Sequence, residues 1–230
     1  MTPSSRQAAQ TTHVGRPARI SRQDIARAAL AIGLDKATLT AIAKELGVDH
    51  SSLYRHIKSR NDILIAAIDL AVQETDWQLD SDHPDGENWR DFAASIAEAC
   101  WDLFQLHPGI AKAIRNLEVT PPSMICIFSA CCQRLEVFGF SAQEATLIMD
   151  SIMDMTNDSS IGWQHMQSKG ENGTPVSSSL ARSWCEMSQK EVALSPYISV
   201  MTDIIKGEPK DWWRQKLDLI LDGAERLRKR

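Results

Sequence analysis

The sequence predicts an all-α protein, and three observations carry this prediction. Apolar residues recur at the 3.6-residue spacing of a helix along most of the 230 residues. Capping sequences precede several of these stretches, and no stretch shows the alternation of β-branched residues that is typical of a strand. Hydrophobic residues make up 43% of the chain, which is enough for a core. The sequence is therefore that of a globular helical protein.

Three short helices are predicted within the first sixty residues. Ser21-Arg22-Gln23-Asp24 has the form of a capping box, and one apolar helical face follows it. Thr38 caps a second helix, and Gly47-Val48-Asp49 separates that helix from a third. In the third helix, Leu53 and Ile57 are expected to be buried. A fourth helix follows after a further capping sequence.

Helical periodicity continues in the rest of the chain, after a polar segment at 78–88. His107-Pro108-Gly109 interrupts it, Pro122 can begin a helix, and Ser141-Ala142-Gln143-Glu144 is a second capping box. These signals predict helices at about 89–106, 110–117, 122–138, 141–166 and from 209 onward.

The second and third helices form a helix-turn-helix arrangement, because they are short and a three-residue turn containing glycine joins them. The third helix leaves hydroxyl, arginine and lysine side chains free of packing, and such groups contact bases and phosphates in a DNA major groove. The alternative is an ordinary helical hairpin with a solvated face. Residues 1–60 contain 10 Lys/Arg and 4 Asp/Glu, whereas residues 61–230 contain 15 and 26. This asymmetry favours a polyanion as the partner of the N-terminal part.

Three stretches are more specific than this pattern: Gly15-Arg16-Pro17, Ile42-Ala43-Lys44-Glu45-Leu46-Gly47-Val48 and Ser52-Leu53-Tyr54-Arg55-His56-Ile57. With them, the chain resembles the TetR family of bacterial transcription regulators. The resemblance is looser in the C-terminal part, where WRDFAASIAEACWDLFQLHPGIAKAI and KLDLILDGAERL are similar to family helices. It implies three parts. Residues 1–19 form a flexible basic arm, residues 20–66 a helix-turn-helix DNA-binding domain, and residues 67–230 a helical effector-binding and dimerisation domain.

The residues and the resemblance together assign a set of DNA contacts. Tyr54 and Lys58 are expected at phosphates, and Arg55 occupies a variable position where it could contact a base. The arm arginines could reach the backbone or the minor groove, or else belong to a solvated tail. The assigned residues are Arg16, Arg19, Thr40, His50, Ser51, Ser52, Tyr54, Arg55, His56 and Lys58.

An apolar stripe on the last predicted helix is too wide for a solvated face. We expect it to form a dimer interface in a four-helix bundle with the helix at 141–166, the alternative being packing inside its own subunit. The stripe consists of Trp213, Leu217, Ile220, Leu221, Ala224 and Leu227.

The resemblance also implies a small-molecule pocket in the C-terminal domain. Asp150, Asp154 and Asp158 follow one another at four-residue spacing, so they either face a cavity that suits a cation or form a solvated stripe. Large apolar residues on these helices either line the pocket or belong to the core. The candidate effector contacts are Trp101, Phe104, Met124, Phe128, Met149, Asp150, Met153, Asp154, Asn157 and Trp163.

Several protein classes are excluded by the sequence. The apolar runs are far shorter than the ~20 residues of a membrane span, and the N-terminus lacks the apolar core of a secretory signal. Five unevenly spaced cysteines suit a reducing cytoplasm, and no metal-ligand spacing, cofactor motif or catalytic motif is present. We therefore expect no enzyme, no cofactor and no metal.

The favoured hypothesis is a cytoplasmic, ligand-responsive transcriptional regulator. It would be a repressor that binds a palindromic double-stranded DNA operator as a homodimer and is released by a small-molecule effector. The alternative is an architectural or partner-recruiting DNA-binding protein on the same scaffold without an effector. The sequence identifies neither the effector nor the operator.

Overall fold

The computed structural model describes residues 20–79, 88–171 and 173–228, and the expected arm at 1–19 lies outside them. In the described part every regular element is a helix, apart from an isolated β-bridge between Lys169 and Pro175. The helices are α1 (Arg22–Ile32), α2 (Leu39–Glu45), α3 (His50–Leu53), α4 (Arg60–Glu74), α5 (Trp89–Leu106), α6 (Ile110–Arg115), α7 (Pro122–Val137), α8 (Ala142–Gln167), α9 (Val176–Lys190), the 3-10 helix η1 (Val192–Leu194), α10 (Ser195–Lys206) and α11 (Pro209–Glu225).

Local capping fixes where the first helices begin. The Ser21 hydroxyl accepts a hydrogen bond from the Asp24 backbone N–H, and the Asp24 carboxylate accepts one from the Ser21 N–H at 2.8 Å. Thr38 caps α2 by accepting from the Ala41 N–H at 3.1 Å. Asp49 occupies the N-cap position of α3 and makes no side-chain cap hydrogen bond.

The N-terminal core holds α1, α2, α3 and the first half of α4 together. Ile25, Ile42, Leu53 and Ile63 are fully buried in it. Because each comes from a different helix, these apolar contacts fix the angles between short helices that would not be stable alone.

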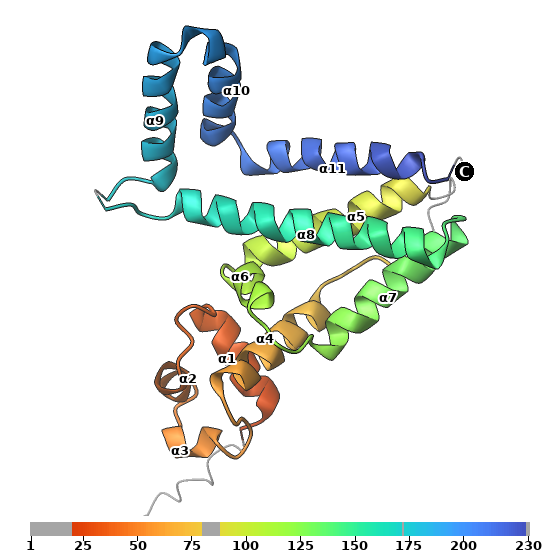
Figure 1. Cartoon of the computed structure of the whole chain (residues 1–230). Helices are drawn as coiled ribbons and strands as arrows, with labels where there is room; N and C mark the ends of the chain where they lie inside the picture. Colours follow the sequence, from red (N-terminus) through yellow and green to blue (C-terminus); the bar gives the residue numbers. More distant parts are fainter. Residues whose placement is uncertain (1–19, 80–87, 172, 229–230) are drawn as a thin grey trace, which may run out of the picture.

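The helix α4 continues from this core into the C-terminal part, and both sets of helices pack against it (Figure 1). Its Asp69 carboxylate accepts a hydrogen bond at 2.8 Å from the backbone N–H of Ser123, in the first turn of α7. The Ser123 hydroxyl donates to the Asp69 carbonyl at 3.2 Å. The predicted domain boundary between residues 66 and 67 therefore falls inside one continuous helix.

The C-terminal body is built on α5, α8 and α11, which pack against one another. At their junction the Trp213 ring is fully buried and lies 4.8 Å from the Trp101 ring, centroid to centroid. The Trp213 indole N–H donates to the Thr156 hydroxyl at 3.0 Å. This hydrogen bond satisfies the polar group that burial of a tryptophan brings into a core.

Most of the α11 stripe that was expected at a dimer interface packs inside the single chain. Within a single chain, Trp213, Leu217, Leu221 and Ala224 are at most 4% exposed, so they cannot contact a partner. Ile220 and Leu227 are half-buried. A helix needs the same apolar stripe for a neighbour in its own chain as for one in another chain, so periodicity could not separate the two cases.

The helices α9 and α10 pack on each other and project away from the body (Figure 1). No helix among the described residues is long and apolar enough to cross a membrane.

We predict that Trp213 stabilises the fold of the single chain. Trp213→Ala should lower the free energy of unfolding by about 3–5 kcal/mol, because it empties a buried site. Thr156→Val should cost about 1–3 kcal/mol by leaving the indole N–H without an acceptor, and less in a Trp213→Phe background. Urea unfolding followed by circular dichroism at fixed protein concentration measures both. Val137→Ala, at a 75% exposed position at the end of α7, is the control and should change little.

We also predict an acid-sensitive contact between α5 and α11. The Glu98 carboxylate is 2.7 Å from both Arg214 Nε and Lys210 Nζ. Burial acts to raise the pKa of Glu98, but hydrogen bonds from Arg214 and Lys210 outweigh it and leave the pKa below its ordinary value. A lowered pKa stabilises the fold at pH values above the ordinary pKa of glutamate, and this stability is lost as the pH falls from that value through the lowered pKa of the folded state.

Unfolding experiments between about pH 6 and pH 3 should therefore show a weaker acid dependence in Glu98→Gln than in the wild type. Glu136→Gln removes a carboxylate from an exposed position on α7 and serves as the control. Parallel pH profiles for Glu98→Gln and the wild type would contradict the prediction.

Candidate nucleic-acid interface and ligand cavity

The α2–turn–α3 unit has the geometry of a helix-turn-helix. Gly47 takes the left-handed conformation, with φ of +63°, and the Val48 N–H donates to the Ala43 carbonyl at 3.0 Å across the turn. Although α3 ends at Leu53, the Ile57 N–H still donates to the Leu53 carbonyl at 3.1 Å. The helical turn thus continues into residues 54–57, which carry several of the predicted contacts.

The predicted DNA contacts of the α3 segment lie next to two buried apolar residues. Leu53 and Ile57 are at most 2% exposed, and they hold the segment against the N-terminal core. Ser52 and His56 are half-buried. The rings of His50 and Tyr54 meet edge to face at 5.2 Å. The exposed members are Thr40 on α2 and His50, Ser51, Tyr54, Arg55 and Lys58 in and after α3.

The side chains of Arg55 and Lys58 form no ion pair with any residue that the structure describes. The nearby Asp62 carboxylate instead accepts from the Lys58 backbone N–H at 2.7 Å and lies 3.8 Å from Arg22. This end of the molecule therefore carries exposed cations without carboxylate partners. The predicted contacts Arg16 and Arg19 lie outside the described residues.

A cavity of about 510 Å³, here called the central cavity, lies between α4 and α8. Met124, Ile127 and Phe128 of α7 form one wall, and Cys100, Leu103 and Phe104 of α5 another. Val72 and Trp77 come from the end of α4 and the turn after it, and Ile114 and Arg115 come from α6. The α8 wall consists of Asp150, Met153, Asp154 and Asn157.

Seven of the ten candidate effector contacts meet at the central cavity: Phe104, Met124, Phe128, Asp150, Met153, Asp154 and Asn157. Two others, Trp101 and Met149, are at most 3% exposed and do not line this cavity. Each is the sequence neighbour of a residue that does line the cavity, Cys100 or Asp150. Helical periodicity could not tell which of two adjacent residues faces the cavity.

The prediction missed Val72 and Trp77 because they precede the C-terminal helices on which it concentrated. The Trp77 indole N–H donates to the Val72 carbonyl at 2.9 Å, which fixes this ring to the last turn of α4. No sequence pattern indicates that contact.

Polar groups of the central cavity gather on its α8 wall. The Asn157 side chain is 8% exposed; its amide N–H donates to the Ala111 carbonyl at 3.1 Å, and its Oδ1 atom has no hydrogen-bond partner. Asp150 and Asp154 are exposed and form no ion pair with the described residues. Arg115 pairs with Asp158 at 3.3 Å. Of the predicted aspartate stripe, two members thus line the cavity and the third forms a surface ion pair.

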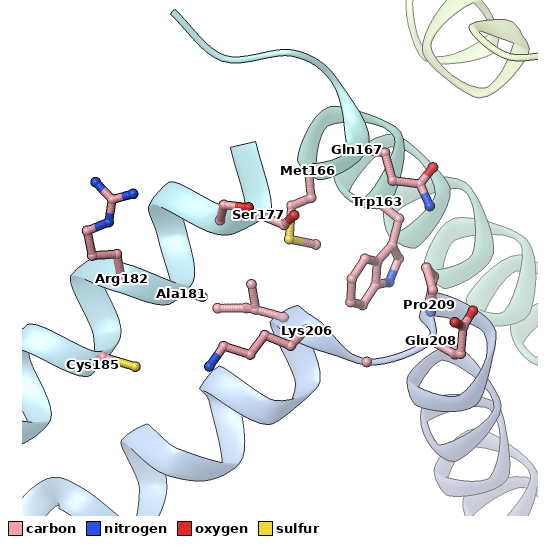
Figure 2. A pocket seen from close by; sticks show the side chains of 13 residues that line it. Trp163, Met166, Gln167, Ser177, Ala181, Arg182, Cys185, Lys206, Glu208 and Pro209 are labelled. Carbon is pink, nitrogen blue, oxygen red and sulfur yellow. The ribbon is translucent and has the colours of Figure 1, made fainter. Parts of the chain in front are cut away.

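Trp163 lines a second cavity of about 660 Å³, where α8 meets the α9–α10 hairpin (Figure 2). Its ring lies between the two groups of helices, while Arg182 and Lys206 come from the hairpin. This candidate effector contact is therefore separate from the central cavity.

No group of three or more His, Cys, Asp or Glu side chains is placed to hold a metal ion in the described ranges. Cys100 of the central cavity and Cys131 of α7 are buried, and burial raises the pKa of both thiols to about 12. Such thiols remain protonated and unreactive at neutral pH.

Comparison with known proteins identifies the N-terminal unit. Residues 24–67 match the family model described as bacterial regulatory proteins, tetR family. Tetracycline repressor protein class D of Escherichia coli is 31% identical over 85 residues, an alignment that covers 35% of the chain and 38% of the length of that curated relative. These matches confirm the family resemblance seen in the sequence.

Solved structures match over most of the chain. A possible TetR family transcriptional regulator from Streptomyces coelicolor A3(2) gives a TM-score of 0.74 at 20% identity, covering 90% of this chain and 100% of that one. ActR of Streptomyces coelicolor, in complex with actinorhodin, gives 0.71 at 19% identity, with 90% and 96% covered. At these identities the likeness shows the fold, and it confirms the predicted all-α architecture.

The burial of the thiols generates a prediction. With a thiol reagent such as Ellman's reagent at about pH 8, the exposed Cys126 and Cys185 should react fast and half-buried Cys132 more slowly. Cys100 and Cys131 should react only at the rate of local or global unfolding. In urea all 5 cysteines should react. Fast modification of more than three thiols in the native protein would contradict this burial.

Proposed function

Because residues 24–67 carry the N-terminal domain of the tetR family of bacterial regulatory proteins, we propose that the chain is a ligand-responsive transcriptional regulator. It acts as a repressor, binds a palindromic operator as a homodimer, and releases the operator when a small molecule enters the central cavity. The observation that carries this proposal is α4, which packs in the helix-turn-helix core at Ile63 and lines the cavity at Val72.

The surface around α3 is the proposed DNA interface. Exposed Tyr54 and Lys58 suit phosphate oxygens, and Arg55 suits a guanine edge in the major groove. Its cations lack intramolecular partners, so binding DNA need not break ion pairs within the chain. The remaining proposed contacts are Thr40, His50, Ser51, Ser52, His56 and the arm residues Arg16 and Arg19.

Two contacts support coupling between the cavity and this interface. The Asp69–Ser123 hydrogen bonds fix α4 to α7, and α7 forms a cavity wall. The short helix α6 also lines the cavity, and its Lys112 lies 4.0 Å from Asp35 between α1 and α2. A ligand that binds one arrangement of these helices more tightly shifts the population toward it, and a ligand that binds both equally does not.

In the proposed function, dimerisation sets the distance between the two DNA-binding surfaces. A twofold dimer would place two α3 segments about one DNA turn apart, ~34–36 Å, and so match a palindromic site. Because the buried stripe of α11 is used inside the chain, the interface needs other surface. On α11, exposed Leu219 and half-buried Ile220 and Leu227 remain for a partner.

The proposal predicts distinct effects for the assigned DNA contacts. Tyr54→Ala and Lys58→Ala should weaken binding to all sequences. The salt slope should fall by about 0.9 in Lys58→Ala, which loses a cation, and stay unchanged in Tyr54→Ala, because the neutral tyrosine hydroxyl neutralises no phosphate. Arg55→Ala should relax base preference at one position. Lys190→Ala, an exposed lysine at the end of α9, is the charge-matched control for Lys58.

Selection of bound genomic fragments by the purified protein gives the operator, and fluorescence anisotropy at several salt concentrations then gives affinities and slopes. Unchanged affinity in Tyr54→Ala, Lys58→Ala and Arg55→Ala, with helicity retained, would show that the interface lies elsewhere. Enrichment of fragments without a shared palindromic motif would instead favour architectural DNA binding.

A further inference from the structure

The lining of the central cavity indicates the chemistry of the molecule that fills it, provided that the proposed ligand-responsive function holds. We propose that this molecule is an organic cation with an apolar body, such as a protonated amine that carries an N–H donor. Asn157, Asp150 and Asp154 recognise its charged end, and the α5 and α7 walls hold its apolar body.

Asn157 supplies the most specific observation. Its side chain is more than nine-tenths buried and lines the cavity. The side-chain amide N–H donates a hydrogen bond to the Ala111 carbonyl at 3.1 Å. This bond fixes the amide orientation and leaves Oδ1 as a hydrogen-bond acceptor with no partner. A buried acceptor without a donor destabilises the fold, so a ligand donor at this point removes a cost already present in the free protein.

The charged side chains of the cavity that have no ion-pair partner among the described residues are both carboxylates. Asp154 and Asp150 stand about one and two helical turns before Asn157 on the same wall, and neither carboxylate has an ion-pair partner among the residues described. The cavity's one lining arginine, Arg115, is already paired with Asp158. An anionic ligand would meet two carboxylates and an acceptor, whereas a cation meets three favourable groups.

The other walls suit an apolar body rather than a hydrated ion. The apolar lining includes Phe104 of α5, three residues of α7 (Met124, Ile127 and Phe128), and Trp77 just after the end of α4. The volume of about 510 Å³ is within the range of ordinary small-molecule sites. Aromatic rings beside a cation add a further attraction through their π faces.

Three probes with one apolar body test the charge preference. They are 2-(1-naphthyl)ethylamine, which is a cation at pH 7, the neutral 2-(1-naphthyl)ethanol and the anion 1-naphthaleneacetate. Isothermal titration calorimetry on the full chain measures each affinity. The amine should bind about tenfold more tightly than the alcohol, and the carboxylate more weakly than both.

Substitutions then assign the preference to the α8 wall. Asp150→Asn and Asp154→Asn should each reduce the amine-over-alcohol ratio several-fold without a comparable loss of alcohol affinity. Asn157→Leu, which removes the acceptor, should lower affinity for both donors, amine and alcohol. Glu136→Gln removes one carboxylate from an exposed position outside the cavity and should leave all affinities unchanged. Thermal unfolding of each variant checks that it folds.

The outcomes separate this inference from the proposed function. Equal affinity for the three probes, no measurable binding of the amine, or a preference that survives both aspartate substitutions would overturn the inference, while operator binding by the α3 surface would be unaffected. Cation-selective binding that depends on the two aspartates supports it. If the bound amine then fails to release a selected operator fragment, the proposed coupling is wrong and the ligand class stands.

Discussion

The continuity of α4 is the constraint on which the rest of the molecule depends. A helix of fifteen residues, Arg60–Glu74, cannot kink sharply within its length without disrupting backbone hydrogen bonds. It packs against α1 in the N-terminal core, and the paired Asp69–Ser123 hydrogen bonds fix it to α7. Val72 lines the central cavity, so the cavity wall and the N-terminal core share this one helix.

Charged side chains are used differently in the N-terminal part around α3 and in the C-terminal body. In the C-terminal body, cations are used between helices: Arg90 pairs with Asp222 at 2.8 Å, and Lys210 and Arg214 share Glu98. Around α3 the corresponding cations remain unpaired and exposed. Because charges interact over only about 8 Å at physiological salt, the acidic body does not cancel the field at that distant surface. One chain can thus combine an overall acidic composition with a surface suited to a polyanion.

The helix α8 shows how much of the candidate site could be predicted. Its aspartates at four-residue spacing were visible in the sequence, and so was the neighbouring amide. Whether each faced a cavity, a core or solvent depends on which helices surround α8. Met149 lies against the core while Asp150 lines the cavity, and Asp158 instead pairs with Arg115 across to α6. A shift of one residue rotates a side chain by about 100° around the helix, so small differences in packing decide these roles.

The sequence by itself determined the helices that begin at clear capping signals, because capping boxes such as Ser21–Asp24 and Ser141–Glu144 act within one turn of the chain. It gave no bounds for α9 and α10. It also determined the helix-turn-helix, whose spacing and glycine turn are local. Only the tertiary structure decided which surface each apolar stripe meets. Trp213 packs against the Trp101 ring and donates a hydrogen bond to Thr156, and the Trp77 indole donates to the Val72 carbonyl in the last turn of α4. The hydrophobic effect has no direction, so periodicity states that a face is buried and leaves its partner to the fold.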